Sequence, residues 1–316
     1  MENLAMLALG ILLLLLGGDS VVKGASGLSQ RLGLSPFAAG ALLLAFATSI
    51  PELAVNAYAT AHGIGDLALG NAIGSNVVNL GLTLGLAAVA APLMVTMRLV
   101  ATEIVLVLVA SVAVLVFGLD GVIARWEGGL LLAGFVAFVV FALARSRRET
   151  AQVQAELKDF AETRLDFSLN LSRFVVASAV LFFGAKFVVQ SAPAIGQWLG
   201  LGSLLTGLIV VAIGTALPEV AAAVMAARRG QGNIVAGMTL GACVFNLLFI
   251  VGGMAVYEPV LVPASFIRFE LPAAMAFALA LYPMLAGDLK LGKREGGILV
   301  ALFALWLTSE LAMAWT

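Results

Sequence analysis

Apolar segments long enough to cross a lipid bilayer recur along the whole of this 316-residue chain. A membrane-spanning helix needs roughly 20 predominantly apolar residues. The chain is 62% hydrophobic and only 11% charged, which excludes an ordinary water-soluble domain. We therefore predict an all-α membrane protein with ten transmembrane helices. Their expected ranges are 4–22, 37–61, 66–90, 99–118, 127–144, 172–190, 204–227, 233–256, 267–286 and 296–315.

One polar connector, residues 145–168, divides the expected spans into five and five. Basic residues collect in the cytoplasmic loops of membrane proteins. With the N-terminus placed outside, fourteen Lys and Arg residues fall on inner loops and flanks, against three on the outer side. We therefore expect a multi-pass protein of the cell membrane, with both termini extracytoplasmic and the connector cytoplasmic.

The two halves contain an internal repeat. Residues 44–85 align without a gap with residues 211–252 at an offset of 167, and 14 of these 42 positions are identical. We take the repeats to be residues 1–144 and 169–316. Because each holds an odd number of spans, the second must enter the membrane from the opposite side. Two inverted five-helix repeats would place their matched sites near the bilayer midplane.

Each repeat carries a proline followed by an acid inside an apolar span, Pro51-Glu52 and Pro218-Glu219. Proline has no N–H, so the carbonyl four residues earlier loses its helical partner. Helices 2 and 7 are therefore expected to break beside their glutamates. The freed carbonyls would be those of Ala47 and Gly214. Ser49 before the first proline is also typical of a hydroxyl cap at a helix start.

Acids in mid-membrane are costly, and two facing carboxylates repel each other unless a proton or a cation neutralises them. Oxygen ligands suit hard cations such as Ca²⁺, Na⁺ and Mg²⁺. The next span adds Asn71, Ser75 and Asn79, which form one polar stripe on a helix. Gly70 and Gly74 beside it would allow close helix approach. The oxygen ligands expected on this reasoning belong to Glu52, Glu219, Thr48, Thr215, Asn79 and Asn246.

These residues resemble the paired alpha-repeats of the cation/calcium exchanger superfamily, specifically its prokaryotic sodium/calcium exchangers. The family's Gly-Thr-Ser-x-Pro-Glu segments are similar to residues 47–52 and 214–219, and its Gly-Asn-x-x-Gly-Ser-Asn segments to residues 70–79 and 237–246. The resemblance covers essentially the full length. It adds to the implied ligands the side chains of Ser49 and Ser75 and the backbone carbonyls of Ala45 and Ala212.

The second half departs from the family pattern. Ala216 and Ala242 stand where serines are expected, and Met238 and Cys243 stand where the first half has asparagines. In the family such hydroxyls help to bind Na⁺. The resemblance therefore implies a retained Ca²⁺ site and at least one weakened Na⁺ site. We expect a departure from three-to-one sodium coupling, with fewer Na⁺ or with H⁺ in place of Na⁺.

The expected function is a secondary antiporter that exchanges Ca²⁺ for Na⁺ by alternating access, without a cofactor. An H⁺/Ca²⁺ or other divalent-cation exchanger on the same scaffold is the near alternative, and a cation channel or a membrane protease is a distant one. One cysteine excludes a multi-cysteine metal site, and no ATP-binding motif is visible. No basic tract suggests nucleic acid. We expect a monomer in the bilayer that is not an enzyme.

Overall fold

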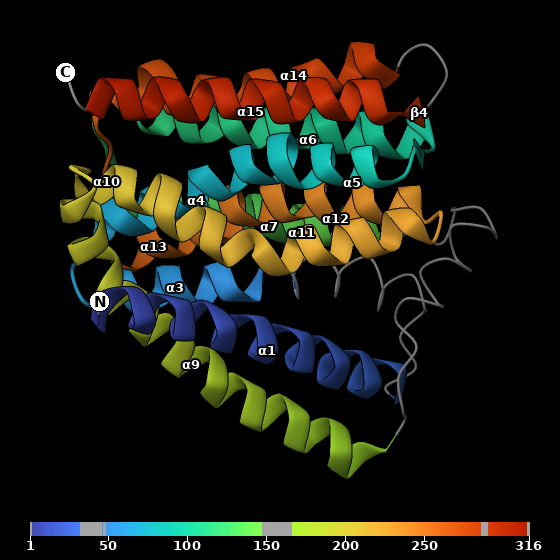
Figure 1. Cartoon of the computed structure of the whole chain (residues 1–316), viewed down its shortest axis with the longest axis horizontal. Helices are drawn as coiled ribbons and strands as arrows, with labels where there is room; N and C mark the ends of the chain where they lie inside the picture. The colour runs from blue at the N-terminus through green and yellow to red at the C-terminus, as the bar shows by residue number, and fades with distance from the viewer. Residues whose placement is uncertain (1, 32–45, 47–48, 147–165, 286–289, 315–316) are drawn as a thin grey trace.

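The computed structural model describes residues 2–31, 46, 49–146, 166–285 and 290–314, and these form a bundle of long helices (Figure 1). The helices of the first half are α1 (Glu2–Arg31), α3 (Ile50–Ala61), α4 (Gly65–Val77), α5 (Leu84–Ala90), α6 (Met97–Phe117) and α7 (Arg125–Ser146). Those of the second half are α9 (Phe167–Trp198), α10 (Ser203–Leu205), α11 (Ala212–Arg228), α12 (Gly232–Val244), α13 (Val251–Tyr257), α14 (Leu271–Leu285) and α15 (Lys293–Ala314).

Four short π-helical segments interrupt these helices. They are η2 (Val78–Thr83), η3 (Thr206–Val211), η4 (Phe245–Ile250) and η5 (Phe266–Glu270). Hydrophobic periodicity does not reveal such insertions, and the sequence analysis did not predict them. Because η2 links α4 to α5 and η4 links α12 to α13, each trio forms one continuous apolar span, at residues 65–90 and 232–257.

Seven helical segments of the described chain are long and apolar enough to cross a membrane, and an eighth arises if a bent pair counts as one span. The all-α membrane class is thereby confirmed, and the observed bounds fall within about five residues of most expected ones. The main differences are α1, which extends nine residues beyond the expected C-terminal end, and α9, which extends five residues beyond its expected start and eight beyond its expected end. Of the expected span 37–61, only Phe46 and the part from Ser49 onward lie within the described residues.

The bent pair contains the Pro218-Glu219 motif. Segments 203–217 and 219–228 meet at an angle of 45°. The bend lies at the predicted position, but α11 continues through it as one helix, so it is a kink and not a full interruption. A kink is what the loss of one helical hydrogen bond produces. In the first half α3 begins at Ile50, with Pro51 in its first turn, as expected for a helix start.

Elements of the second half follow those of the first at a nearly constant offset. α12, η4, α13 and the strand β3 (Val260–Leu261) each begin 167 residues after α4, η2, α5 and the strand β1 (Leu93–Met94). α15 begins 168 residues after α7. The strand β2 (Val122–Ile123) likewise has a later counterpart, β4 (Lys290–Leu291). The sequence repeat therefore corresponds to a repeat of secondary structure.

The two halves are tied together by crosswise contacts. β1 pairs with β4 and β2 pairs with β3, both antiparallel, so each two-stranded ladder takes one strand from each half. In the same way α7 packs on α13 and α15 packs on α5. α1 packs along α9 at one side of the bundle, while α6, α14 and α15 lie on the opposite side (Figure 1). Between them α4 and α12 are the most deeply buried spans.

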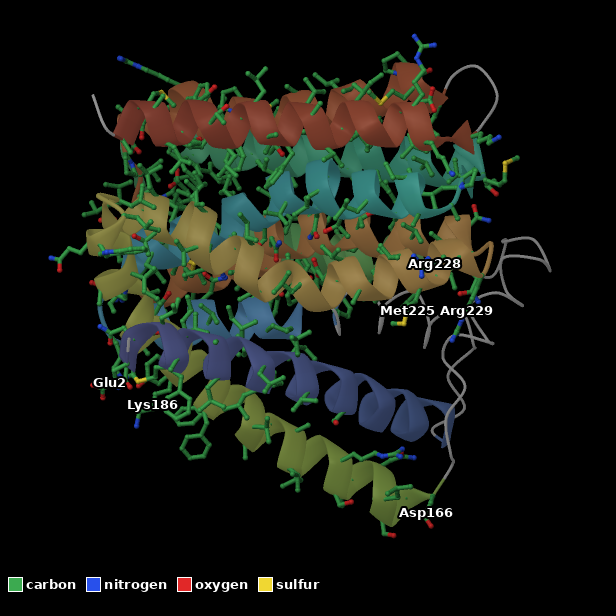
Figure 2. All side chains as sticks on the ribbon, in the orientation of Figure 1. Glu2, Asp166, Lys186, Met225, Arg228 and Arg229 are labelled. Carbon is green, nitrogen blue, oxygen red and sulfur yellow. The ribbon has the colours of Figure 1, made fainter. Side chains whose placement is uncertain are left out.

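α1 begins and α15 ends at the end of the bundle that we call the terminal face, and α9 begins at the opposite end, the connector face (Figure 1). Figure 2 places Glu2 and Lys186 at the terminal face and Asp166, Arg228 and Arg229 at the connector face.

Candidate functional site

Glu52 and Glu219 meet inside the bundle, where α3 packs against α11. Their exposed fractions are 0% and 1%. Ser49, three residues before Glu52, donates a hydrogen bond of 3.3 Å from Oγ to Oε1 of Glu219. The two carboxylates are close enough for their charges to act on each other. The structure thus brings together the two acids that the sequence singled out, one from each half.

The expected capping role of Ser49 is wrong. Ser49 occupies the N-cap position of α3, but its side chain makes no cap hydrogen bond. Its hydroxyl points across the interface to Glu219 instead. The hydroxyl therefore acts as a donor to a buried carboxyl group of the other half and not as an acceptor for its own helix.

Thr215 and Asn71 join the site from α11 and α4. The Thr215 hydroxyl lies 3.4 Å from Oδ1 of Asn71 and 3.3 Å from the backbone oxygen of Ala212. Ala212 is the first residue of α11 after the π-helical segment η3. The carbonyl expected as a ligand at Ala212 therefore lies beside the threonine expected to act with it.

Ser75 and Asn79 continue the polar stripe of α4 into η2. Both residues are fully buried, and the Ser75 hydroxyl has no hydrogen-bond partner among the described residues. Oδ1 of Asn79 accepts a hydrogen bond of 3.3 Å from Thr83. Asn79 is the second residue of η2. Single π turns occur frequently at functional sites, because they redirect side chains and carbonyls within a helix.

Asn246 is the second residue of η4, which is the same position that Asn79 has in η2. Its Nδ2 donates a hydrogen bond of 3.1 Å to Oδ1 of Asn76. Cys243 lies 3.9 Å from the backbone oxygen of Asn76. Oδ1 of Asn246 is buried and has no hydrogen-bond partner among the described residues, so it is available as an oxygen ligand.

Glycines allow the site helices to approach each other closely. A Cβ on Gly70 would collide with the backbone oxygen of Leu204, and one on Gly74 with that of Leu208. From the other side, a Cβ on Gly207 would collide with the backbone oxygen of Leu67. The close approach predicted for Gly70 and Gly74 is therefore present, with α10 and η3 as the partners of α4.

Four aromatic rings pack beside the site. The ring centroid of Phe135 lies 5.3 Å from that of Phe46, 5.7 Å from that of Phe245 and 5.0 Å from that of Phe249. Phe245 occupies the place in η4 that Val78 has in η2. The cluster takes Phe46 and Phe135 from the first half and Phe245 and Phe249 from the second, so it joins the two halves through apolar rings.

The donors at the site are oxygen atoms. Within the described ranges no group of three or more His, Cys, Asp or Glu side chains is placed to hold a metal ion. A bound cation would therefore depend on the two glutamates together with neutral hydroxyl, amide and backbone oxygens. That set suits a hard cation such as Ca²⁺ or Na⁺ and is poor for zinc or copper. Two expected ligands, Thr48 and the Ala45 carbonyl, lie outside the described residues.

Buried polar residues that the sequence analysis did not single out accompany the site. Asn56 and Thr60 follow Glu52 on α3 at intervals of four residues and are 0% and 9% exposed. Elsewhere, Glu310 is 1% exposed and interacts electrostatically with Glu270. Glu270 matches Glu103 at the offset of 167 and was expected at the membrane interface or at a helix cap, but it is only 2% exposed. Single polar residues in apolar runs give no periodic signal. For Asn56 and Thr60, however, the spacing of four residues from Glu52 indicates that they share a helix face with that acid.

Comparison with known proteins places this geometry in a family. The profile of the sodium/calcium exchanger protein family matches residues 2–144 and 169–311. The inner membrane protein YrbG of Escherichia coli (strain K12) is 32% identical over 259 residues, covering 81% of this chain and 80% of its own. The sodium/calcium exchanger MaX1 of Methanosarcina acetivorans is 27% identical over 340 residues, covering 96% and 97%.

A solved structure has the same overall fold. The sodium-calcium exchanger NCX_Mj, soaked with 2.5 mM Na⁺ and 10 mM Sr²⁺, superposes with a TM-score of 0.70 at 26% sequence identity, and the match covers 98% of both chains. The profile match extends over both halves, and its two segments flank the polar connector. This chain is therefore a multi-pass membrane protein that belongs to the sodium/calcium exchanger family.

Proposed function

We propose that the chain is an antiporter that exports Ca²⁺ in exchange for Na⁺ by alternating access. The observation that carries the proposal is the buried meeting of Glu52 and Glu219 from the two halves. Two facing carboxylates in a low-dielectric interior need a cation or a proton between them. A divalent cation neutralises both at once.

The proposed Ca²⁺ ligands are the two carboxylates, the hydroxyls of Thr48, Ser49, Ser75 and Thr215, the amide oxygens of Asn79 and Asn246, and the carbonyls of Ala45 and Ala212. Ca²⁺ takes about six to eight oxygens, so not all of them need bind at once. Sodium ions would use overlapping ligands, so that the glutamates bind either Ca²⁺ or the counter-ion. Mutually exclusive occupancy makes the transport an exchange.

The proposed topology is ten spans in two inverted repeats, with the terminal face extracytoplasmic. Support comes from the offset of 167 or 168 residues between matched elements and from the crosswise pairing of the strands. Arg228 and Arg229 at the connector face agree with the excess of basic residues expected on the cytoplasmic side (Figure 2).

We further propose that the coupling departs from three-to-one sodium exchange. Ser49 donates a hydrogen bond to Glu219, whereas Ala216, at the matching position of the second half, has no hydroxyl to offer Glu52. Neither oxygen of Glu52 has a hydrogen-bond partner among the described residues, and the nearby Thr215 hydroxyl interacts with it only weakly. The environment of Glu52 is therefore short of one ligand that a bound Na⁺ would use.

The same observation favours H⁺ as a second candidate for the counter-ion. A buried carboxylate with few hydrogen-bond donors is the kind of group that takes up a proton in place of a metal ion. H⁺/Ca²⁺ exchange would use the same scaffold and the same Ca²⁺ ligands. The two candidates differ in which gradient drives Ca²⁺ movement.

The test is ⁴⁵Ca²⁺ uptake by proteoliposomes with a Na⁺ gradient or a pH gradient imposed separately. We expect uptake with Na⁺, and abolition of uptake in both Glu52→Gln and Glu219→Gln. Glu127→Gln is the control, because Glu127 is also buried but only caps the start of α7 through the Ala124 N–H. Full transport by both site variants would refute the proposed site. Uptake driven by pH alone would identify the H⁺ exchanger.

A further inference from the structure

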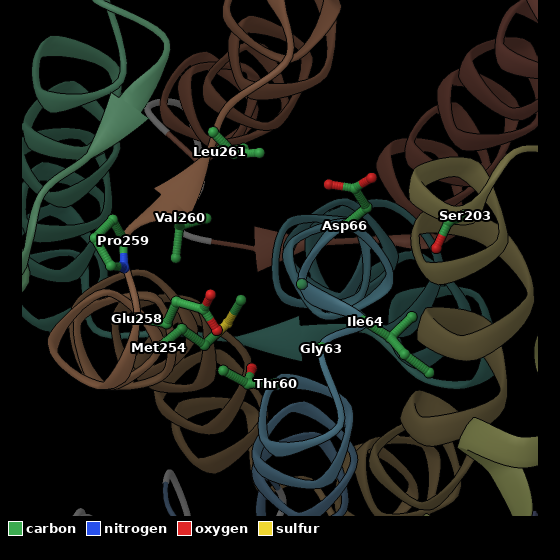
Figure 3. Close-up of a pocket in the computed structure, with 11 residues that line it drawn as sticks. Thr60, Gly63, Ile64, Asp66, Ser203, Met254, Glu258, Pro259, Val260 and Leu261 are labelled. Carbon is green, nitrogen blue, oxygen red and sulfur yellow. The ribbon is translucent and has the colours of Figure 1, made fainter.

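Two adjoining cavities open between the site and the terminal face. The outer cavity has a volume of about 290 Å³ and is lined by Asp66, Glu258 and Thr60, among others (Figure 3). The inner cavity, of about 250 Å³, is lined by Asn56 and again by Thr60. Because Thr60 and Met254 line both, the two cavities adjoin, and together they define a path along α3.

Buried polar groups without partners face this path. Both polar atoms of the Asn56 side chain lack a hydrogen-bond partner within the described structure, and so does the hydroxyl of Thr60. Asn56 is 0% exposed and Thr60 is 9% exposed. Leaving such groups unpaired costs free energy, so their presence calls for a ligand that pairs with them. Asn56 and Thr60 follow Glu52 at i+4 and i+8, which puts all three on one face of α3.

The outer cavity is acidic. Asp66 and Glu258 reach it from different helices, and none of the eleven residues that line it is Lys or Arg (Figure 3). Glu258 occupies the C-cap position of α13. A negative charge there opposes the helix dipole, so helix stability does not explain the residue. Two exposed carboxylates beside buried hydroxyl and amide oxygens are the chemistry that attracts a hard cation.

The internal repeat shows that this arrangement belongs to one face only. At the offset of 167, the counterparts of Asn56 and Thr60 in α11 are Ala223 and Ala227. The counterparts of Asp66 and Glu258 are Asn233 and Ala91, both uncharged. Oδ1 of Asn233 accepts a hydrogen bond of 2.8 Å from the Thr96 N–H, which is a structural contact. The polar path is therefore present in one half of the repeat and absent from the matching positions of the other.

We propose that Asp66, Glu258 and Thr60 form a cation-binding vestibule at the terminal face, and that Asn56 passes the cation between this vestibule and Glu52. The proposal rests on the proposed antiporter function and deepens it. It assigns to one membrane face an electrostatic preference for the divalent cation that the other face lacks. Eight helical residues span about 12 Å, so Asn56 divides the distance from Thr60 to Glu52 into two steps.

The experiment compares right-side-out and inverted membrane vesicles that carry the same protein. The terminal face is identified by labelling a Glu2→Cys variant with a membrane-impermeant maleimide. Initial rates of ⁴⁵Ca²⁺ transport are then measured against the Ca²⁺ concentration on each side. For the double variant Asp66→Asn/Glu258→Gln we expect the KM at the terminal face to rise roughly fivefold through loss of electrostatic attraction. The KM at the connector face and the maximal rate should stay within twofold.

Two controls separate this effect from general damage. Glu2→Gln removes an exposed acid of the terminal face outside the vestibule and should leave the KM unchanged on both sides. Raising the ionic strength to about 1 M with choline chloride should shrink the difference between wild type and double variant, because the Debye length falls to about 3 Å. An unchanged KM, or an equal rise on both sides, would overturn the vestibule.

The relay is tested separately with Asn56→Leu, a substitution of similar volume. Removing buried unpaired polar groups should hold or raise the thermal stability, while the maximal transport rate falls at least about tenfold. Asn56→Ser, which keeps a small polar group, should retain more transport than Asn56→Leu. Undiminished transport by Asn56→Leu would overturn the relay. If wild type carries no Ca²⁺, or if Glu52→Gln still does, the antiporter proposal itself has failed.

Discussion

Two neighbouring glycines of α7, Gly128 and Gly129, give a sharp test of how the helices pack. A Cβ on Gly128 would lie 2.7 Å from the Cβ of Ala255, 2.7 Å from the oxygen of Gly252 and 2.8 Å from the nitrogen of Val256. A Cβ on Gly129 would meet nothing within 4 Å among the described residues. The two positions therefore differ in packing alone.

The second half repeats this pair at an offset of 168 residues. A Cβ on Gly296 of α15 would lie 2.7 Å from the oxygen of Gly85 and 2.8 Å from the Cβ of Ala88. A Cβ on Gly297 would meet open space within the described structure. The chain thus supplies the same experiment twice, once on each side of the repeat.

The expected magnitudes follow from these contacts. Replacing Gly by Ala in a helix favours the helix by about 1 kcal/mol at either position of a pair. At Gly128 and Gly296 the new methyl group meets backbone atoms that cannot rotate away, and such overpacking costs about 1–3 kcal/mol. Because the propensity gain is common to both members, Gly128→Ala should be less stable than Gly129→Ala by about 1–3 kcal/mol. The same difference should separate Gly296→Ala from Gly297→Ala.

The assay is thermal unfolding of the detergent-solubilised protein at one fixed heating rate, because membrane proteins commonly unfold irreversibly. For a chain of this size 1 kcal/mol corresponds to about 2 °C in Tm. We expect Gly128→Ala to melt about 2–6 °C below Gly129→Ala. Equal Tm values within either pair would refute the inferred close contact of α7 with α13 or of α15 with α5.

Three further substitutions probe the site and the core. Ala216→Ser should place a hydroxyl near Glu52. Because a hydrogen bond to a charged group contributes about 1.5–3 kcal/mol, the apparent Na⁺ affinity in Ca²⁺ exchange should rise about tenfold or more. An unchanged Na⁺ dependence would contradict the proposed ligand deficit. Glu310→Gln removes one of two interacting buried acids and should raise the unfolding free energy by about 1 kcal/mol, so a lowered Tm would count against it. Phe135→Ala should cost about 2–4 kcal/mol through loss of four ring contacts, whereas truncation of the exposed Phe141 should cost far less in the same melting assay.

The sequence predicted the coarse fold well because its signals were strong. Long apolar runs locate the spans, and the offset of 167 predicts the repeat of elements from α4 to β3. The Pro218 motif predicts a bend at the right residue, although the helix kinks where a full break was expected. The division into ten spans and two inverted halves stays a prediction, since residues 32–45 lie outside the described structure.

The details of the site were less accessible because they depend on contacts between distant segments. The change of partner at Ser49, from its own helix to Glu219, depends on 170 residues of intervening fold. The π turns at Asn79 and Asn246 insert one residue into a helix, which leaves hydrophobic periodicity almost unaltered. Asn56 and Glu310 each stand alone in an apolar run, and only the tertiary structure shows what surrounds them.

The two short strand ladders carry a consequence for the origin of the chain. Each joins a strand of one half to a strand of the other, and neither half pairs its own two strands. Under the proposed inverted arrangement, an ancestor of half this length would have had two open strand edges and a single glutamate. Such a chain could have worked only as a pair of copies inserted in opposite directions, and fusion of the two genes would then have freed each copy to diverge, as the alanines at positions 216, 223 and 227 have done.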